Sequence, residues 1–140
     1  MKKILVGVDG SEASLKAAKW AVDLAAATGA SVTFAYSIVP VVYPAEMMWV
    51  PTVEFERAQQ EAAAKLLSQA REQTQRTGVA IETVTLHGPA AEAMADEAKA
   101  HAYDLLAVGS RGHGAVKRIL MGSVASRLVH ICERAVLVVR

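Results

Sequence analysis

Residues 109–126 combine glycines, serines and basic side chains at spacings that suit an anionic ligand. The stretch begins with Gly109-Ser110-Arg111-Gly112, directly after a short apolar run. Glycines at the end of a strand let the backbone adopt left-handed torsions and approach a ligand closely, because no Cβ stands in the way. Successive backbone N–H groups can then donate to phosphate oxygens. We therefore expect this turn to form one half of a phosphate site.

Gly122-Ser123 supplies the second half, because helical spacing begins at this point. The first N–H groups of a helix have no partner within it, and the helix dipole adds roughly 0.3–1 kcal/mol for an anion. The Ser123 hydroxyl is a further donor. Lys117 and Arg118 lie between the two glycine groups and are placed to screen phosphate charge. The stretch therefore predicts a phosphate cradle with two sets of donors.

Five short apolar runs of strand length alternate with four segments of helical periodicity. The expected strands cover residues 4–8, 32–37, 79–86, 105–108 and 135–139, and the expected helices cover 11–28, 53–77, 89–102 and 123–131. This alternation is typical of an α/β fold in which helices cover both faces of a parallel sheet. We expect a single domain, residues 1–140, built as a three-layer sandwich with a five-stranded parallel sheet in the order 3-2-1-4-5 and four helices.

Local signals place the ends and the buried faces of these elements. Ser11 is expected as the N-cap of the first helix and Gly29 as its stop. Pro89 is expected at the first position of the third helix. Three prolines predict a loop over residues 38–52, in which Trp49 is interpreted either as a lid or as packing on the core or on a partner chain. The second helix is expected to bury the stripe Phe55, Ala58, Ala62, Leu66 and Ala70.

The expected sheet also predicts where a ligand binds. In open α/β sheets, ligands lie beyond the carboxyl ends of the strands, at the point where the strand order reverses. Asp9 follows the first expected strand and Gly109 follows the fourth. If these two strands are neighbours, Asp9 and Gly109 should line the same crevice.

The pattern Gly109-x-x-Gly112, nine residues, then Gly122-Ser123 resembles the ATP-binding signature of the universal stress protein family. A Gly-x-x-Gly alone is more often a structural turn, whereas this longer pattern matches without gaps. Neither the G-x-x-x-x-G-K-[ST] string nor G-x-G-x-x-G occurs. The resemblance extends to residues 3–11, 104–112 and 136–139. It implies a Rossmann-like fold of the adenine nucleotide alpha hydrolase-like type.

The resemblance also implies which residues bind ATP. Asp9 is expected to contact the adenosine part, and Ser37 is expected to offer backbone groups to the base. Ribose and phosphates are expected on Gly109, Gly112, Gly122 and Ser123. The other residues expected at the site are Val8, Val108, Arg111, Val124 and Ala125.

A phosphate cradle alone provides no chemistry, since phosphoryl transfer also needs a metal clamp and a group that positions the attacking atom. Asp9 is within reach of a magnesium ion bound with ATP, but the sequence assigns no second carboxylate and no base. We therefore predict no catalytic residue and no metal site made by the protein alone. The resemblance implies a regulatory ATP-binding module of stress responses with little or no hydrolysis. Two alternatives stay open: a slow ATPase or nucleotide-transferring enzyme of the same architecture, and a dimeric interaction protein that does not use nucleotide.

Composition bounds the partners and the compartment. With 53% hydrophobic and 21% charged residues the chain is expected to fold, and a net charge of +1 is too small to attract nucleic acid or a membrane surface. No run approaches the roughly 20 apolar residues of a membrane span. Cys132 is the one cysteine, which suits a reducing compartment, and a cytoplasmic location is expected.

Two further features concern metals and partners. The four histidines are scattered without a ligand spacing, so zinc is not expected, and His113 inside the glycine loop is interpreted by default as a surface residue. The last strand, Ala135 to Arg140, is expected at a sheet edge with no element after it. Open edges invite pairing, and the resemblance implies the same, so we expect a homodimer through this strand.

Overall fold

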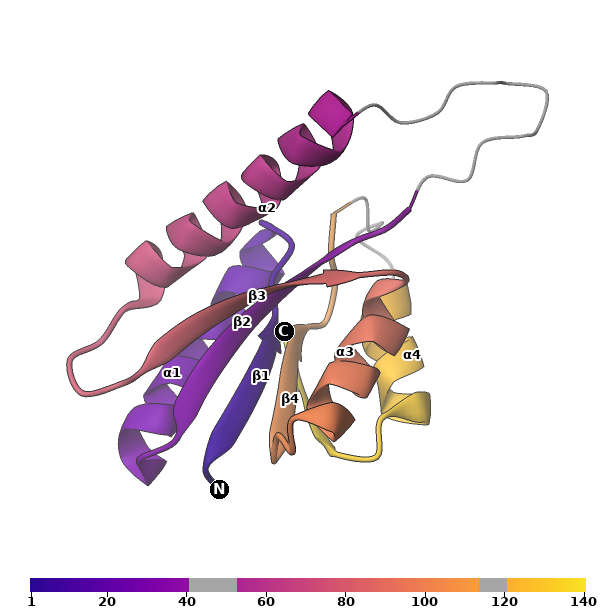
Figure 1. Cartoon of the computed structure of the whole chain (residues 1–140). Coiled ribbons are helices and arrows are strands. Elements are labelled where there is room, and N and C mark those ends of the chain that lie inside the picture. The colour runs from indigo at the N-terminus through magenta and orange to yellow at the C-terminus, as the bar shows by residue number, and fades with distance from the viewer. Residues whose placement is uncertain (41–52, 114–120) are drawn as a thin grey trace.

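The computed structural model describes residues 1–40, 53–113 and 121–140, and the expectations for Trp49, Lys117 and Arg118 lie outside these ranges. The described part holds five strands and four helices, which follow one another alternately along the chain (Figure 1). In chain order they are β1 (Lys3–Gly7), α1 (Glu12–Thr28), β2 (Ser31–Ile38), α2 (Val53–Thr74), β3 (Ile81–His87), α3 (Ala90–Ala100), β4 (Leu105–Gly109), α4 (Ser123–Ile131) and β5 (Ala135–Val139).

The five strands form one parallel sheet in the order β3-β2-β1-β4-β5, which confirms the expected topology. Figure 1 shows α1 and α2 on one face of the sheet and α3 and α4 on the other. Buried side chains form two clusters that correspond to these two faces. The molecule is therefore the three-layer sandwich that the sequence predicts, with the strand order reversing between β1 and β4.

The central strand β1 is apolar on both faces because both faces are covered. Ile4 and Val6 belong to the cluster under α1 and α2, and Leu5 belongs to the cluster under α3 and α4. All three side chains are fully buried. A continuous apolar run is therefore what a parallel strand between two helical layers requires.

Helix α1 begins and ends as its sequence predicts. The Ser11 hydroxyl accepts the Ser14 N–H at 3.2 Å, which satisfies one donor that the first turn leaves without a partner. Gly29 adopts φ 71°, and its N–H donates to the Ala25 carbonyl. A left-handed residue at this position stops the helix, and glycine adopts that conformation without strain.

The predicted buried stripe of α2 is confirmed at Ala70, but Phe55 and Leu66 are only half-buried, and the helix ends at Thr74 instead of residue 77. The alanines at 58 and 62 are exposed. Three consecutive alanines at 62–64 and two leucines at 66–67 fit two adjacent stripes equally well, so periodicity alone could not choose between them. Packing against the sheet selects the stripe Ala63, Leu67, Ala70 and Thr74.

The limits of α3 also differ from the prediction. Pro89 has φ −56° and ψ 129°, so it is the N-cap and not the first helical residue, and its carbonyl accepts the Ala93 N–H. The fixed φ of proline suits both positions, and only ψ distinguishes them. The helix ends at Ala100, two residues early, and Ala102 has φ 53°, which a right-handed helix cannot contain.

Strands β3 and β5 form the two edges of the described sheet. Strand β3, expected near an edge, lies at one end of the described sheet beside β2; the buried Ile81 is followed by two exposed residues, three half-buried residues and the exposed His87. Among the described residues, strand β5 pairs with β4 alone. Within the described ranges, no helix is both long and apolar enough to cross a membrane.

Candidate functional site

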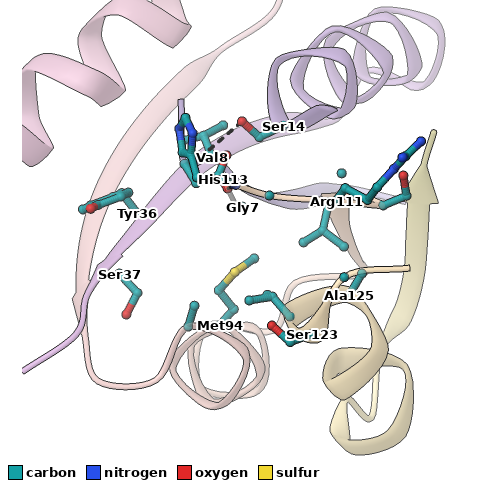
Figure 2. A pocket seen from close by; sticks show the side chains of 18 of the residues that line it. Gly7, Val8, Ser14, Tyr36, Ser37, Met94, Arg111, His113, Ser123 and Ala125 are labelled. Carbon is teal, nitrogen blue, oxygen red and sulfur yellow. Dashed lines mark hydrogen bonds between the residues drawn. The ribbon is translucent and has the colours of Figure 1, made fainter. Parts of the chain in front are cut away.

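A cavity of about 590 Å³ opens at the carboxyl edge of the sheet, at the point where the strand order reverses. The ends of β1, β2 and β4 and the first residues of α3 and α4 line it (Figure 2). Pockets of this size hold small organic ligands and cofactors. The topology alone therefore produces a ligand-sized hollow at the predicted place.

Every residue predicted for the site lines this cavity. In particular, Asp9 and Gly109 lie in the same crevice, as expected from the strand order. The eleven residues are Val8, Asp9, Ser37, Val108, Gly109, Arg111, Gly112, Gly122, Ser123, Val124 and Ala125.

Nine further described residues line the cavity and were not assigned to it from the sequence. Those on β2 could have been found by the rule that placed Asp9, because β2 ends at the same edge of the sheet. Met94 carries only the signal of a buried helix position. The nine residues are Gly7, Ser14, Ala35, Tyr36, Ala90, Met94, Ser110, His113 and Met121.

The glycines of the cradle serve close approach and not left-handed torsion. Among the described glycines, φ is positive only at Gly10, Gly29, Gly78 and Gly88, so the torsions expected at the cradle glycines are wrong. A Cβ at Gly112 would lie 2.6 Å from Asp9 Oδ2. Gly112 therefore lets the loop after β4 approach the carboxylate that follows β1.

Packing against α1 explains why residue 109 is a glycine, without reference to any ligand. A Cβ there would lie 2.6 Å from the carbonyl carbon of Ala13 and 2.8 Å from its oxygen. Both atoms are backbone of α1, which cannot turn aside as a side chain can. Gly109 lines the cavity, but the space that its missing Cβ leaves is taken up by α1.

Asp9 is held as a carboxylate by hydrogen bonds. Its Oδ1 accepts the Ser11 N–H at 2.9 Å, and its Oδ2 accepts the His113 N–H at 3.3 Å. Partial burial would raise the pKa of Asp9, but the bonds from Ser11, Ser14 and His113 outweigh it and hold the pKa below its ordinary value. The cavity therefore contains a fixed negative charge at neutral pH.

The start of α4 supplies the second set of donors, but Gly122 is not one of them. Gly122 is the N-cap, with extended backbone torsions, and its own N–H already donates to the Ser110 carbonyl at 2.6 Å. The Gly122 N–H is therefore not among the donors available at this helix start. The N–H groups of Ser123, Val124 and Ala125 form the first turn and have no acceptor within the helix. Ser123, Val124 and Ala125 line the cavity, and N–H groups at a helix start together with a hydroxyl are donors that suit an anion.

The loop after β4 is fixed from both sides. The buried Ser110 donates its N–H to the Val139 carbonyl of β5 at 2.6 Å, and its own carbonyl accepts the Gly122 N–H. One residue thus connects the cavity, the edge strand and the start of α4. The course of the loop depends on the edge strand as well as on α4.

The end of the cavity formed by β2 is anchored by Ser37. The Ser37 hydroxyl donates to the Gly88 carbonyl at 2.7 Å, and the Gly88 N–H donates to the Ile38 carbonyl at 2.9 Å. Figure 2 shows Tyr36 and Ser37 at the opposite end of the cavity from Arg111. The hydroxyl of Ser37 is therefore used within the fold, which leaves its backbone as the group available to a ligand.

Charged side chains are few among the described residues that line the cavity: Asp9 is the one carboxylate, and Arg111 and His113 are the basic residues. In the part of the chain that the structure describes, no three acidic, histidine or cysteine side chains gather where they could hold a metal ion. A metal held here would need ligands from a bound molecule in addition to Asp9.

Comparisons with a family model and with known sequences point to the same family. The sequence model of the Universal stress protein family matches residues 1–140. The universal stress protein MJ0531 of Methanocaldococcus jannaschii is 37% identical over 143 residues, which cover 99% of this chain and 82% of that protein. The universal stress protein YxiE of Bacillus subtilis is 30% identical over 145 residues, which cover 99% of this chain and 98% of that protein.

Comparison with solved structures gives the same fold. A universal stress protein solved in complex with cAMP superposes with a TM-score of 0.75 and 28% identity over 99% of this chain and 97% of that one. The universal stress protein UspA of Lactobacillus plantarum superposes with a TM-score of 0.77 and 26% identity over the same shares of the two chains.

Proposed function

The chain belongs to the universal stress protein family, and on that premise we propose that it binds adenine nucleotides, ATP included, in the cavity at the carboxyl edge of the sheet. The observation that carries the proposal is that the glycine turn at Gly112 and the first turn of α4, whose N–H groups have no acceptor within the helix, line one cavity. A relative of 28% identity was solved in complex with cAMP, which supports an adenine nucleotide as the ligand class.

The two ends of the cavity suit the two ends of a nucleotide. The first turn of α4 offers backbone donors and the Ser123 hydroxyl, which favour phosphate oxygens. The opposite end is formed by Ala35, Tyr36 and Ser37, where apolar surface and backbone groups suit a purine ring. We therefore place the phosphates at Gly122 and Ser123 and the base toward Tyr36 and Ser37.

The fixed charge of Asp9 bears on how a triphosphate is held. A carboxylate close to phosphates repels them unless a cation lies between the groups. Magnesium commonly uses one or two carboxylates together with phosphate oxygens, and Asp9 fits that pattern as the ligand from this chain. We propose that ATP binds with magnesium and that the ion neutralises charge at this point.

The proposed role is regulation, in which occupancy of the cavity changes the association of the protein with partners. Ser110 supports this role, because its N–H bonds the edge strand β5 while its carbonyl bonds the start of α4. A ligand that tightens this loop thereby acts on β5. In the part of the chain that the structure describes, β5 pairs with β4 alone, and we propose that a second copy pairs with its other edge to form a homodimer.

Calorimetric titration of nucleotide-free protein with ATP, ADP, AMP and cAMP, each with and without magnesium, tests the proposal. A micromolar constant corresponds to about −8 kcal/mol. Gly122→Val places methyl groups where the loop and α4 meet and should abolish the heat, whereas Val129→Ala, on the exposed side of the same helix, should not. Wild-type protein that gives neither heat nor a thermal shift at millimolar ATP would refute the proposal. Phosphate release measured in the same samples distinguishes binding from slow hydrolysis.

A further inference from the structure

Met94 lies at the floor of the cavity, between the two ends where we place the base and the phosphates. It belongs to α3, it is only 4% exposed, and it nevertheless lines the cavity. Figure 2 shows its side chain between Ser37 and Ser123, with the thioether directed toward Gly7. The flexible end of one side chain therefore closes the bottom of the hollow.

The thioether of Met94 occupies space that exists because β1 has a glycine at its end. A Cβ at Gly7 would lie 2.6 Å from Met94 Cε and 2.9 Å from its sulfur, and 3.1 Å from Val108 Cγ1. Gly7 is not among the described glycines with positive φ, so its backbone does not require glycine. Gly7 and Met94 therefore form a matched pair in which one residue gives up the volume that the other fills.

We infer that Met94 limits the depth of the site beneath the bound nucleotide and so the size of the substituents that the site accepts, and that Gly7 keeps Met94 out of the ligand's space. The inference rests on the proposed nucleotide site and adds a specificity determinant to it. Methionine has three rotatable bonds and adapts its shape, so a small shift of the thioether changes the depth of the floor. Shortening Met94 should deepen the cavity under the ligand, and adding a methyl group at Gly7 should make it shallower.

The first experiment measures affinities for ATP and for three ATP analogues that carry a benzyl-sized substituent on C2, C8 or N6 of adenine. Met94→Ala should improve binding of at least one analogue relative to ATP by about tenfold, as expected when a pocket gains the volume of several methylenes. Leu67→Ala is the matched control, because Leu67 is equally buried but belongs to the cluster on the other face of the sheet. In Leu67→Ala, the ratio of analogue affinity to ATP affinity should stay at the wild-type value. A Met94→Ala protein with unchanged ratios for all three analogues would overturn the inference.

The second experiment tests the pairing of Gly7 and Met94 directly. Gly7→Ala should push the thioether into the cavity and weaken ATP binding by about tenfold, and the double variant Gly7→Ala/Met94→Ala should restore it. Additive effects in the double variant, or full ATP affinity in Gly7→Ala, would contradict the pairing of these two residues. Wild-type protein that binds no ATP would refute the proposed function and this inference together, whereas wild-type binding without the rescue refutes only the inference.

Discussion

Asp9 and His113, which are 104 residues apart in the sequence, are joined by a hydrogen bond in which Asp9 Oδ2 accepts the His113 N–H at 3.3 Å. The bond connects the turn after β1 to the glycine loop after β4. These two strands are neighbours at the place where the sheet reverses its order. The two turns that shape the cavity are thus fixed to each other directly, and the absence of a side chain at Gly112 makes the contact possible.

Gly112→Ala should separate these two turns. Its Cβ would lie 2.6 Å from Asp9 Oδ2, so either the carboxylate or the loop must move. Loss of one hydrogen bond and of the loop position should weaken ATP binding about tenfold, or about 1.4 kcal/mol, in calorimetric titration.

A glycine remote from the cavity provides the control for that experiment. Gly78 has φ 84°, and a methyl group added there would meet open space, so Gly78→Ala introduces backbone strain alone. It should lower the free energy of unfolding by about 1 kcal/mol and leave ATP affinity unchanged. Equal affinity in Gly112→Ala and wild type would show that the contact with Asp9 does not shape the site.

Asp9 should make stability depend on pH in the acidic range. Its pKa is lowered in the fold from an ordinary value of 3.8, so the ionised form stabilises the fold at every pH above that value. As the pH falls below 3.8 and through the lowered pKa, the unfolded chain takes up the proton first and this stabilisation is lost. Asp9→Asn cannot titrate, and it should be less stable than wild type by roughly 1 kcal/mol at neutral pH.

Urea unfolding at a series of pH values measures this difference. The gap in unfolding free energy between wild type and Asp9→Asn should be constant above the ordinary pKa and should narrow at lower pH. A gap that is independent of pH down to the acid limit of folding would mean that the hydrogen bonds from Ser11 and His113 do not favour the carboxylate.

Gly109→Ala should damage the fold without any ligand present. The new Cβ would lie 2.6 Å from the backbone of Ala13, which can move only if α1 moves, so we expect a loss of about 1–3 kcal/mol in unfolding free energy. Gly122→Ala is the comparison, because the nearest atoms to its Cβ are 3.4 Å away, and it should change stability by less than about 1 kcal/mol. Equal losses in the two variants would contradict this assignment of Gly109 to packing.

The sequence predicted the architecture well because its signals are local or topological. Alternating apolar runs and helical segments determine the layers, and the cap residues Ser11 and Gly29 act within a few residues of their own position. The prediction of the buried stripe of α2 was partly wrong for a physical reason. The alanines of this helix are equally apolar on adjacent faces, so packing against the sheet determines which face is buried. Local signals thus predict where helices and strands occur, whereas packing determines which face of an alanine-rich helix is buried.

The location of the cavity could be predicted from the sequence, but the roles of its individual residues could be predicted only in part. The edge rule and the glycine spacing placed Asp9 and Gly112 in one cavity. The role of Gly109 was missed, since its near contact with Ala13 joins residues that no sequence pattern connects. The pair Gly7 and Met94 was missed for the same reason. Close approaches between distant segments are a property of the packed fold, and glycine spacing does not distinguish them from ligand contacts.

The proposed dimer can be tested at the free edge of β5. Val139 directs its carbonyl toward β4, where it accepts the Ser110 N–H, so the backbone of Val138 faces the open edge because successive residues alternate in a strand. Val138→Pro removes an outward donor without removing a bond to β4, and it should convert the dimer to a monomer in sedimentation velocity. Val138→Ala loses most of the same side chain but keeps the N–H, and it should remain dimeric. A Val138→Pro protein that folds by circular dichroism and still sediments as a dimer would place the interface elsewhere on the molecule.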